Sequence, residues 1–149
     1  MTDPDKMIRP FDAADTGALS AIWLDASRVA HAFIGEQRLL CQRQLIEEKY
    51  LPMAETWVAC QGETPVGFIS LLDSFVGGLF VAPDGQGRGI GRALVTLAAQ
   101  RKGALSVEVY SENRSAVLFY QALGFQEVSR RPTDDEGLPF ELILMHREA

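Results

Sequence analysis

Four glycines and two arginines fall within eight residues, directly before a stretch with helical periodicity. They occupy the segment Gly85-Gln86-Gly87-Arg88-Gly89-Ile90-Gly91-Arg92. Glycines let a backbone approach a ligand closely and adopt positive φ angles, and the N-terminus of a following helix offers unpaired N–H groups with a partial positive charge. The pattern therefore predicts a loop that binds phosphate through its main chain, where a plain strand-to-helix turn would need only one or two glycines.

Two common nucleotide motifs do not fit this loop. A P-loop requires Gly-Lys followed by Ser or Thr at the helix start, whereas residues 91–93 are Gly-Arg-Ala. A dinucleotide fingerprint requires G-x-G-x-x-G, but its third glycine position holds Ile90 or Arg92. An antiparallel meander is also predicted before the loop, where dinucleotide folds have a parallel unit.

A second pattern lies downstream of the loop. Its residues are Asn113-x-x-Ala116-x-x-Phe119-Tyr120-x-x-x-Gly124-Phe125. Together with the Gln86-x-x-Gly89-x-Gly91 loop, this pattern resembles the GCN5-related N-acetyltransferase (GNAT) family, and most of all its small, stand-alone bacterial members. The resemblance extends over nearly the whole chain, because residues 8–23, IRPFDAADTGALSAIW, are similar to the family's first strand and helix.

The resemblance implies acetyl-CoA as co-substrate, without a metal. Strands 79–81 and 107–109 would splay apart, and the pantetheine arm would pair with residues 79–81 like an added strand. The main chain of residues 86–92 would hold the diphosphate, with Arg88 or Arg92 assisting, and Asn113 would bond to the pantetheine. The implied cofactor-binding residues are Leu79, Phe80, Val81, Gln86, Gly87, Arg88, Gly89, Ile90, Gly91, Arg92, Asn113, Ala116, Phe119 and Tyr120.

The implied reaction is direct attack of a primary amine on the thioester through a tetrahedral intermediate, with Tyr120 as the catalytic residue that donates to the leaving thiolate. Without the resemblance, Tyr120 would be interpreted as an aromatic residue on the buried face of a helix. A phenol with a pKa of about 10 is protonated at pH 7 and can donate a hydrogen bond. Full proton transfer to a thiolate with a reference pKa of about 8.5 would be uphill by about 2 kcal/mol.

The general base departs from the family pattern. An alkyl ammonium with a pKa of about 10.4 must lose a proton before it attacks. Many members place a glutamate early in the strand before the glycine loop, where this sequence has Gly77. His31, Asp73, Glu108 and a chain of waters are the candidates, and we expect an ordered water to relay the proton with no indispensable residue.

The acceptor pocket is expected between residues 31–37 and 131–140. Its substrate-binding candidates are His31, Phe33, Trp57 and Tyr110, although each is also a common type of core or helix-end residue. The acidic run Asp134-Asp135-Glu136 would either attract a cationic amine or form a solvated turn. The expected acceptor is a small-molecule amine or an amine of a protein or peptide.

Hydrophobic periodicity predicts the elements that position these residues. The predicted strands are 7–11, 56–60, 65–72, 75–81, 105–109, 125–130 and 140–147, and the predicted helices are 15–31, 36–50, 90–102 and 113–123. Pro52 is expected to end the second helix. The fold class is α+β in a single domain over residues 1–149. The resemblance implies a GNAT fold: a mixed, mostly antiparallel sheet of six to seven strands, about four helices, and splayed central strands that form the acetyl-CoA cleft.

Composition narrows the function further. A net charge of −6 over 149 residues argues against a nucleic-acid partner, which would need a basic face. No apolar run approaches the roughly 18 residues needed to span a membrane, and the N-terminus lacks a signal sequence. Cys41 and Cys60 suggest neither a disulfide framework nor a zinc site. We therefore expect a cytoplasmic monomer or homodimer.

Two other functions remain open at this point. A non-catalytic, acetyl-CoA-binding regulatory module would keep the loop, and the missing strand glutamate favours it while Tyr120 opposes it. A toxin-type enzyme that acetylates charged tRNA would want a basic surface, which the net charge of −6 disfavours.

Overall fold

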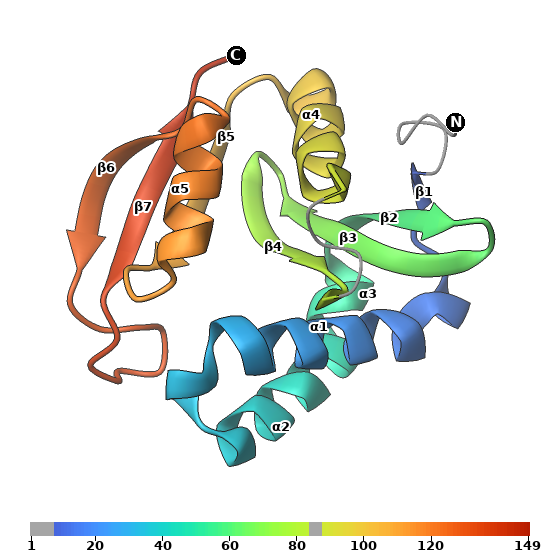
Figure 1. The fold of residues 1–149 in the computed structure, drawn as a ribbon, viewed down its shortest axis with the longest axis horizontal. Helices are drawn as coiled ribbons and strands as arrows, with labels where there is room; N and C mark the ends of the chain where they lie inside the picture. The colour runs from blue at the N-terminus through green and yellow to red at the C-terminus, as the bar shows by residue number, and fades with distance from the viewer. Residues whose placement is uncertain (1–7, 84–87) are drawn as a thin grey trace.

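The computed structural model of the protein describes residues 8–83 and 88–149 (Figure 1). Within these ranges, seven strands form one sheet in the order β1-β2-β3-β4-β5-β7-β6, and the β4–β5 pair is the only parallel one among them. The strands are β1 (Ile8–Pro10), β2 (Glu55–Gln61), β3 (Thr64–Leu72), β4 (Phe75–Val81), β5 (Leu105–Tyr110), β6 (Gln126–Arg131) and β7 (Leu142–Arg147). The predicted α+β class and the seven predicted strands are confirmed.

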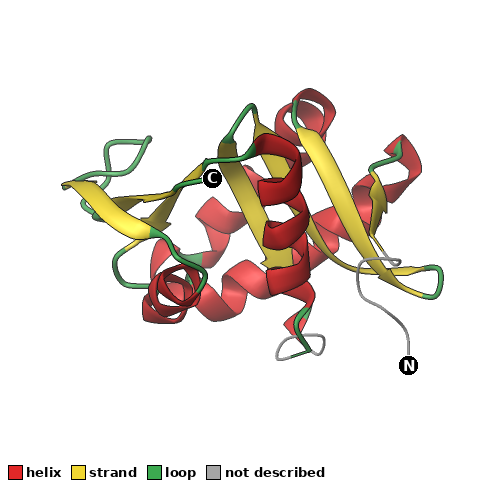
Figure 2. Ribbon diagram, turned by 90° about the horizontal axis from the view of Figure 1, so that it is seen from above, coloured by secondary structure: helices red, strands yellow, loops and turns green. Residues whose placement is uncertain are grey.

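Helices cover both faces of the sheet (Figures 1 and 2). They are α1 (Thr16–Ala30), α2 (Glu36–Leu45), α3 (Leu51–Met53), α4 (Ile90–Lys102) and α5 (Arg114–Ala122). A π-helical turn, Ile46–Tyr50, joins α2 to α3. The prediction that Pro52 ends the second helix is wrong, because the helical stretch continues from the π-helical turn through Pro52 to Met53, and the chain becomes extended at Ala54.

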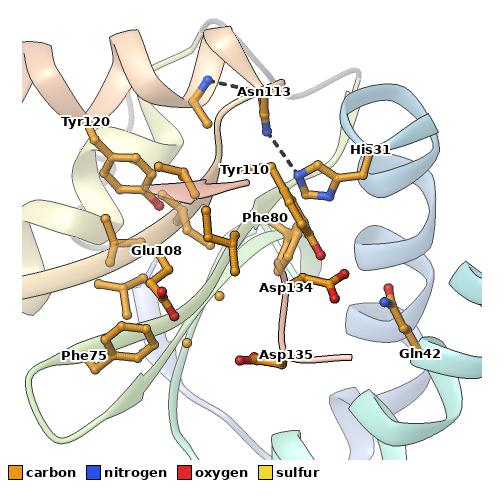
Figure 3. Close-up of a pocket in the computed structure, with 18 of the residues that line it drawn as sticks. His31, Gln42, Phe75, Phe80, Glu108, Tyr110, Asn113, Tyr120, Asp134 and Asp135 are labelled. Carbon is orange, nitrogen blue, oxygen red and sulfur yellow. Dashed lines mark hydrogen bonds between the residues drawn. The ribbon is translucent and has the colours of Figure 1, made fainter. Parts of the chain in front are cut away.

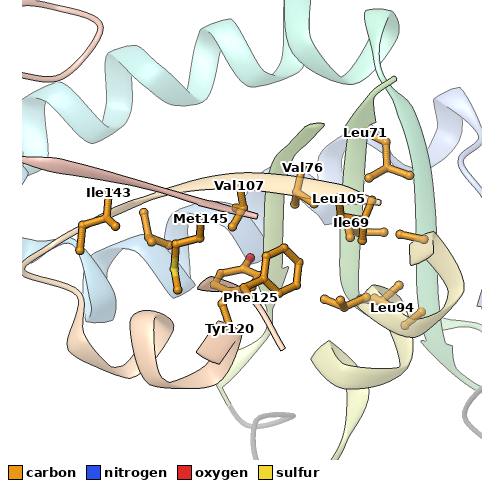
Figure 4. Close-up of a cluster of buried hydrophobic side chains, with 14 of the residues drawn as sticks. Ile69, Leu71, Val76, Leu94, Leu105, Val107, Tyr120, Phe125, Ile143 and Met145 are labelled. Atoms are coloured by element: carbon orange, nitrogen blue, oxygen red, sulfur yellow. The ribbon is translucent and has the colours of Figure 1, made fainter. Parts of the chain in front are cut away.

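The sheet buries apolar side chains on both faces. Successive strand residues point to opposite sides, so Ile69 of β3 packs beneath α4 while its neighbour Phe68 packs beneath α1. The core under α4 and α5 includes Leu94, Tyr120 and Phe125 (Figure 4). The strands therefore form a rigid central layer that fixes the positions of the helix ends.

Strands β4 and β5 diverge in the middle of this layer. Their pairing consists of Phe75↔Ser106 and Val76↔Val107. Beyond Val76, β4 continues beside β3, and beyond Val107, β5 continues beside β7. The predicted splay of the central strands is confirmed, and it opens the sheet beside the first residues of α4 and the N-terminus of α5.

Candidate active site

Two cavities adjoin at the splayed strands. We call the first, of about 480 Å³, the loop-side cavity, because Gly89, Gly91 and Arg92 line it. We call the second, of about 340 Å³, the acidic cavity, because carboxylates line it. Both cavities share His31, Leu79, Phe80, Asn113 and Ala116 in their walls. A molecule in one cavity therefore approaches a molecule in the other across these shared residues.

The loop-side cavity gathers most of the cofactor-binding residues that the sequence predicts. Those that line it are Leu79, Phe80, Val81, Gly89, Ile90, Gly91, Arg92, Asn113, Ala116 and Phe119. Gln86 and Gly87 lie outside the described residues. Arg88 is exposed and lines neither cavity in the described part of the chain, so Arg92 is the better placed of the two arginines.

Glycine is favoured at two positions where α4 begins. Gly89 has φ 79°, a left-handed conformation that side chains disfavour, and it precedes the first helical residue, Ile90. A Cβ on Gly91 would lie 3.3 Å from the ring of Phe119, closer than most Cβ contacts, so a larger residue would require the Phe119 ring to shift. The first-turn N–H groups of α4 lack partners within the helix. With the charge of Arg92, they make this end of the cavity suited to an anion.

The acidic cavity is lined by four carboxylates, Glu108, Asp134, Asp135 and Glu136, and none of its described lining residues is a lysine or an arginine. Arg131 pairs with two of these groups: its Nε and Nη2 donate to Glu108 at 2.8 and 3.0 Å, and its Nη2 also donates to Asp135 at 2.7 Å. Arg38 forms an ion pair with Glu136. Four carboxylates against two arginines leave the cavity with an excess of negative charge.

Asp134 is not part of a simple solvated turn. Its carboxylate is buried and accepts hydrogen bonds from the N–H groups of Glu136 and Leu138, at 3.0 and 2.9 Å. These bonds fold residues 134–138 back on themselves and bring Asp135 and Glu136 to the cavity. The sequence alternative of a solvated acidic turn is therefore wrong for Asp134.

Tyr120 reaches the acidic cavity from α5. Its ring is 5% exposed and packs edge-to-face against Phe119 and Phe125. Its hydroxyl points into the cavity, toward the side that holds Glu108 (Figure 3). Burial raises the pKa of the Tyr120 phenol, so the hydroxyl stays protonated at neutral pH and can act as a hydrogen-bond donor.

His31 lies where α1 ends, in the wall that both cavities share. Its ring packs edge-to-face against Phe33 and Tyr110. Its Nε2 lies 3.1 Å from Nδ2 of Asn113 (Figure 3). Burial lowers the pKa of His31 to about 4, so the imidazole is neutral at pH 7. Of the four predicted substrate-binding residues, His31 and Tyr110 line the acidic cavity. Phe33 does not line it but packs edge-to-face against both of them.

The structure does not bring two predicted residues to the site. Trp57 lies on the α4 side of the sheet, where its ring stacks under Arg101 at 4.0 Å and its indole N–H donates to Glu55. In the described part of the chain it lines neither cavity. Asp73 lies in the β3–β4 turn and is exposed, and it is not among the described residues that line either cavity. Gly77 does line the acidic cavity, without a carboxylate to offer.

Sequence reasoning missed polar residues of the acidic site, and it placed Arg131 in the pocket segment 131–140 without predicting its partner. Gln42 and Tyr50 line the cavity from the α2 side, and Arg131 holds Glu108. Tyr50 ends the π-helical turn, whose extra residue shifts it away from the position that regular helical periodicity assigns. Arg131 pairs with Glu108 across the intervening strand β7, which no local pattern reveals.

Comparison with known proteins shows which family this chain resembles in sequence and fold. The family model described as "Acetyltransferase (GNAT) domain" matches residues 52–127. The chain is 35% identical to the Escherichia coli peptidyl-lysine N-acetyltransferase YiaC over 134 residues, which cover 89% of this chain and 92% of that relative. The solution structure of apo YjaB from Escherichia coli superposes with a TM-score of 0.85 at 33% identity, covering 93% of this chain and 95% of that one.

A more distant structure carries a ligand. YncA from Salmonella typhimurium, solved with acetyl-CoA, shares the fold with a TM-score of 0.68 at 23% identity, covering 95% of this chain and 92% of that one. Among residues 8–83 and 88–149, no group of three or more His, Cys, Asp or Glu side chains is placed to hold a metal ion. No helix in those same ranges has the length and apolar character to cross a membrane.

Proposed function

The chain belongs to the GNAT family of acetyltransferases, and on that premise we propose that it transfers the acetyl group of acetyl-CoA to the ε-amine of a lysine side chain in a peptide or protein. The observation that carries the proposal is the pair of adjoining cavities, one at the glycine loop and one lined by four carboxylates. Family membership favours catalysis over the non-catalytic alternative. Escherichia coli YiaC and YjaB, which are both named peptidyl-lysine N-acetyltransferases, support lysine as the acceptor.

Acetyl-CoA fits the loop-side cavity. The left-handed Gly89, the bare Gly91 and the N-terminus of α4 offer main-chain donors for the diphosphate, and Arg92 adds a positive charge. On the β5 side, β4 pairs no further than Val76. The backbone of Leu79 can therefore pair with the amides of the pantetheine arm, which would run toward Asn113 and the acidic cavity.

A lysine side chain fits the acidic cavity. An ammonium group entering it meets more carboxylates than cations, and opposite charges attract strongly in a partly buried site. The aromatic ring of Tyr110 offers an apolar wall for the lysine methylenes. The amine nitrogen would arrive from the side opposite the thioester, across the shared wall.

Among the candidate bases, Glu108 is the best placed. His31 is unsuited, because the lone pair of its Nε2 is engaged with Asn113. Asp73 lies away from the cavities. Glu108 lines the acidic cavity near Tyr120, and Arg131 fixes the position of its carboxylate. We therefore assign Glu108 as the proton acceptor, either directly or through one water, in place of a water relay alone.

The residues then divide the reaction between them. The ammonium gives one proton to Glu108, and the free amine forms the C–N bond with the acetyl carbon. As the C–S bond breaks, Tyr120 donates a hydrogen bond to the leaving thiolate, which takes up the second proton of the amine nitrogen. No net oxidation occurs, and the products are the acetylated lysine and the CoA thiol.

The test is mass spectrometry of a lysine-containing peptide, with its N-terminus blocked, after incubation with the protein and acetyl-CoA. We expect a mass increase of one acetyl group on the lysine. The matched control is the same peptide with arginine in place of lysine, which keeps the charge and should remain unmodified. Absence of lysine acetylation across a panel of peptide sequences would contradict the assignment of a lysine acceptor.

A further inference from the structure

The Asn113 side chain has a fixed orientation in the wall shared by the two cavities. Its Oδ1 accepts the backbone N–H of Ala116 at 3.2 Å and so caps the N-terminus of α5. A backbone N–H can only donate, which identifies the capping atom as the oxygen. The atom that faces His31 is therefore the amide nitrogen, Nδ2.

This orientation determines the protonation of His31. An amide nitrogen donates and does not accept, so Nε2 of His31, 3.1 Å away, must accept the hydrogen bond with its lone pair. The ring proton then lies on Nδ1, and the imidazole is neutral. The lowered pKa of His31 agrees with this tautomer.

The His31 ring is itself held in place. It follows α1 directly, and its backbone N–H donates to the carbonyl of Ser27 at 2.7 Å. Edge-to-face contacts with Phe33 and Tyr110, at centroid distances of 5.9 and 5.1 Å, restrain the plane of the imidazole. The imidazole thus connects the end of α1 to the start of α5, 82 residues away in the sequence.

We propose that His31 is a positioning residue for acyl transfer: its Nε2 lone pair holds one N–H of the Asn113 amide, so that the second N–H is presented to the acyl donor where the cavities adjoin. This role rests on the proposed function, because it assumes that acetyl-CoA occupies the loop-side cavity. It is distinct from proton transfer, since the lone pair that a base would use is already engaged. An acceptor atom at this position, rather than an imidazole as such, is what the role requires.

The first measurement needs no cofactor. Nitrogen-15 NMR of the histidine rings at pH 7 should show His31 with its proton on Nδ1 and a hydrogen-bonded, unprotonated Nε2. The chain has two histidines, so a His31→Gln variant assigns the signals. A proton on Nε2 would overturn the proposal even if acetyl-CoA binds as expected.

The second measurement compares His31→Gln with His31→Leu. Glutamine can place a carbonyl oxygen near the Nε2 position, whereas leucine fills similar space without an acceptor. We expect kcat/KM for acetyl-CoA to fall on the order of tenfold in His31→Leu, the typical effect of losing one hydrogen bond, and to stay within about threefold in His31→Gln. Equal losses in both variants, with unchanged melting temperatures, would mean that His31 serves packing alone.

Asn113→Ala completes the comparison. In that background, His31→Leu should cause no further loss, because the interaction is already absent. A tenfold loss that persists without Asn113 would overturn the proposal. Calorimetry of acetyl-CoA binding without any acceptor distinguishes failure of the proposed acceptor from failure of the proposed role of His31. If the wild-type protein binds acetyl-CoA but acetylates no lysine, the proposed acceptor is wrong. The His31 variants can then still be compared by their affinity for acetyl-CoA.

Discussion

Glu108 on β5 and Arg131 on β6 form a two-point ion pair across the strand between them, with donor–acceptor distances of 2.8 and 3.0 Å. Such paired bonds fix both the position and the plane of a carboxylate. Glu108 thus occupies one defined place in the acidic cavity, although Gly77 leaves β4 without the glutamate that its family often uses. Gly77 and Glu108 line the same cavity, and under the proposed function Glu108 provides the carboxylate that β4 lacks.

Arg131→Leu should therefore impair catalysis without abolishing it. Glu108 would keep its charge but lose its fixed orientation, and we expect kcat to fall on the order of tenfold with the Kd for acetyl-CoA unchanged. Steady-state kinetics on an acetylated peptide substrate, with calorimetry for acetyl-CoA, provide the measurement. Arg130→Leu is the matched control, because Arg130 pairs with the exposed Glu127 and Glu141. Equal effects of the two variants would contradict the role of Arg131.

Tyr120→Phe should lower kcat far more than it weakens acetyl-CoA binding. Phenylalanine keeps the packing against Phe119 and Phe125 but removes the donor, and loss of a positioned acid commonly costs about 10²–10⁴ in rate. Tyr50→Phe, at the half-exposed wall of the same cavity, is the control and should have a small effect. A Tyr120→Phe rate within about threefold of wild type would make Tyr120 a core residue only.

Gly89→Val should abolish acetyl-CoA binding while the fold survives. Gly89 has φ 79° at the start of α4, so valine would both strain the turn and place a side chain where the diphosphate is proposed to lie. Gly62→Val is the matched control, because Gly62 has φ 62° in the β2–β3 turn, away from both cavities. The two variants should lose similar thermal stability, and calorimetry should show loss of acetyl-CoA binding in Gly89→Val alone. Unchanged affinity in a folded Gly89→Val protein would contradict the phosphate-binding role of the loop.

The buried His31 makes stability depend on pH in a defined window. Folding lowers its pKa from 6.5 to about 4, so its contribution to stability is complete above pH 6.5 and is lost as the pH falls toward 4. A shift of this size corresponds to at most about 3 kcal/mol. Tyr110, which packs against His31, has a raised pKa and stays neutral in this window. Urea unfolding at pH 7 and pH 5 should show a larger loss in wild type than in His31→Gln, and equal losses would contradict the assignment.

The sequence predicts the elements well because their signals are local. Alternation along residues 65–72 and the three- and four-residue spacing in residues 90–102 are each produced by one element packing on one sheet. The glycine loop and the 113–125 pattern are likewise contiguous, so most residues of the loop-side cavity could be predicted, whereas Ala26 and Ala30 of α1 could not. Tyr120 was placed by the same pattern.

The acidic site was less predictable because its residues meet only in three dimensions. His31 and Asn113 come together across 82 residues, and Arg131 reaches Glu108 over a neighbouring strand. The prediction that Trp57 lines the acceptor pocket is wrong, because the sequence of a strand does not show which face of the sheet an aromatic residue occupies. Its observed stack with Arg101 places it on the α4 side.

The most direct test of the account is kcat/KM for acetylation of a lysine peptide by wild type, Glu108→Gln and Glu63→Gln, the last being an exposed control in the β2–β3 turn. We predict that Glu108→Gln lowers kcat/KM by about 10²-fold or more at pH 7, the usual range for a general base, with unchanged acetyl-CoA affinity, and that Glu63→Gln matches wild type. The loss should shrink toward pH 9, where more of the amine is already deprotonated. A Glu108→Gln enzyme as active as wild type at pH 7 would contradict the account.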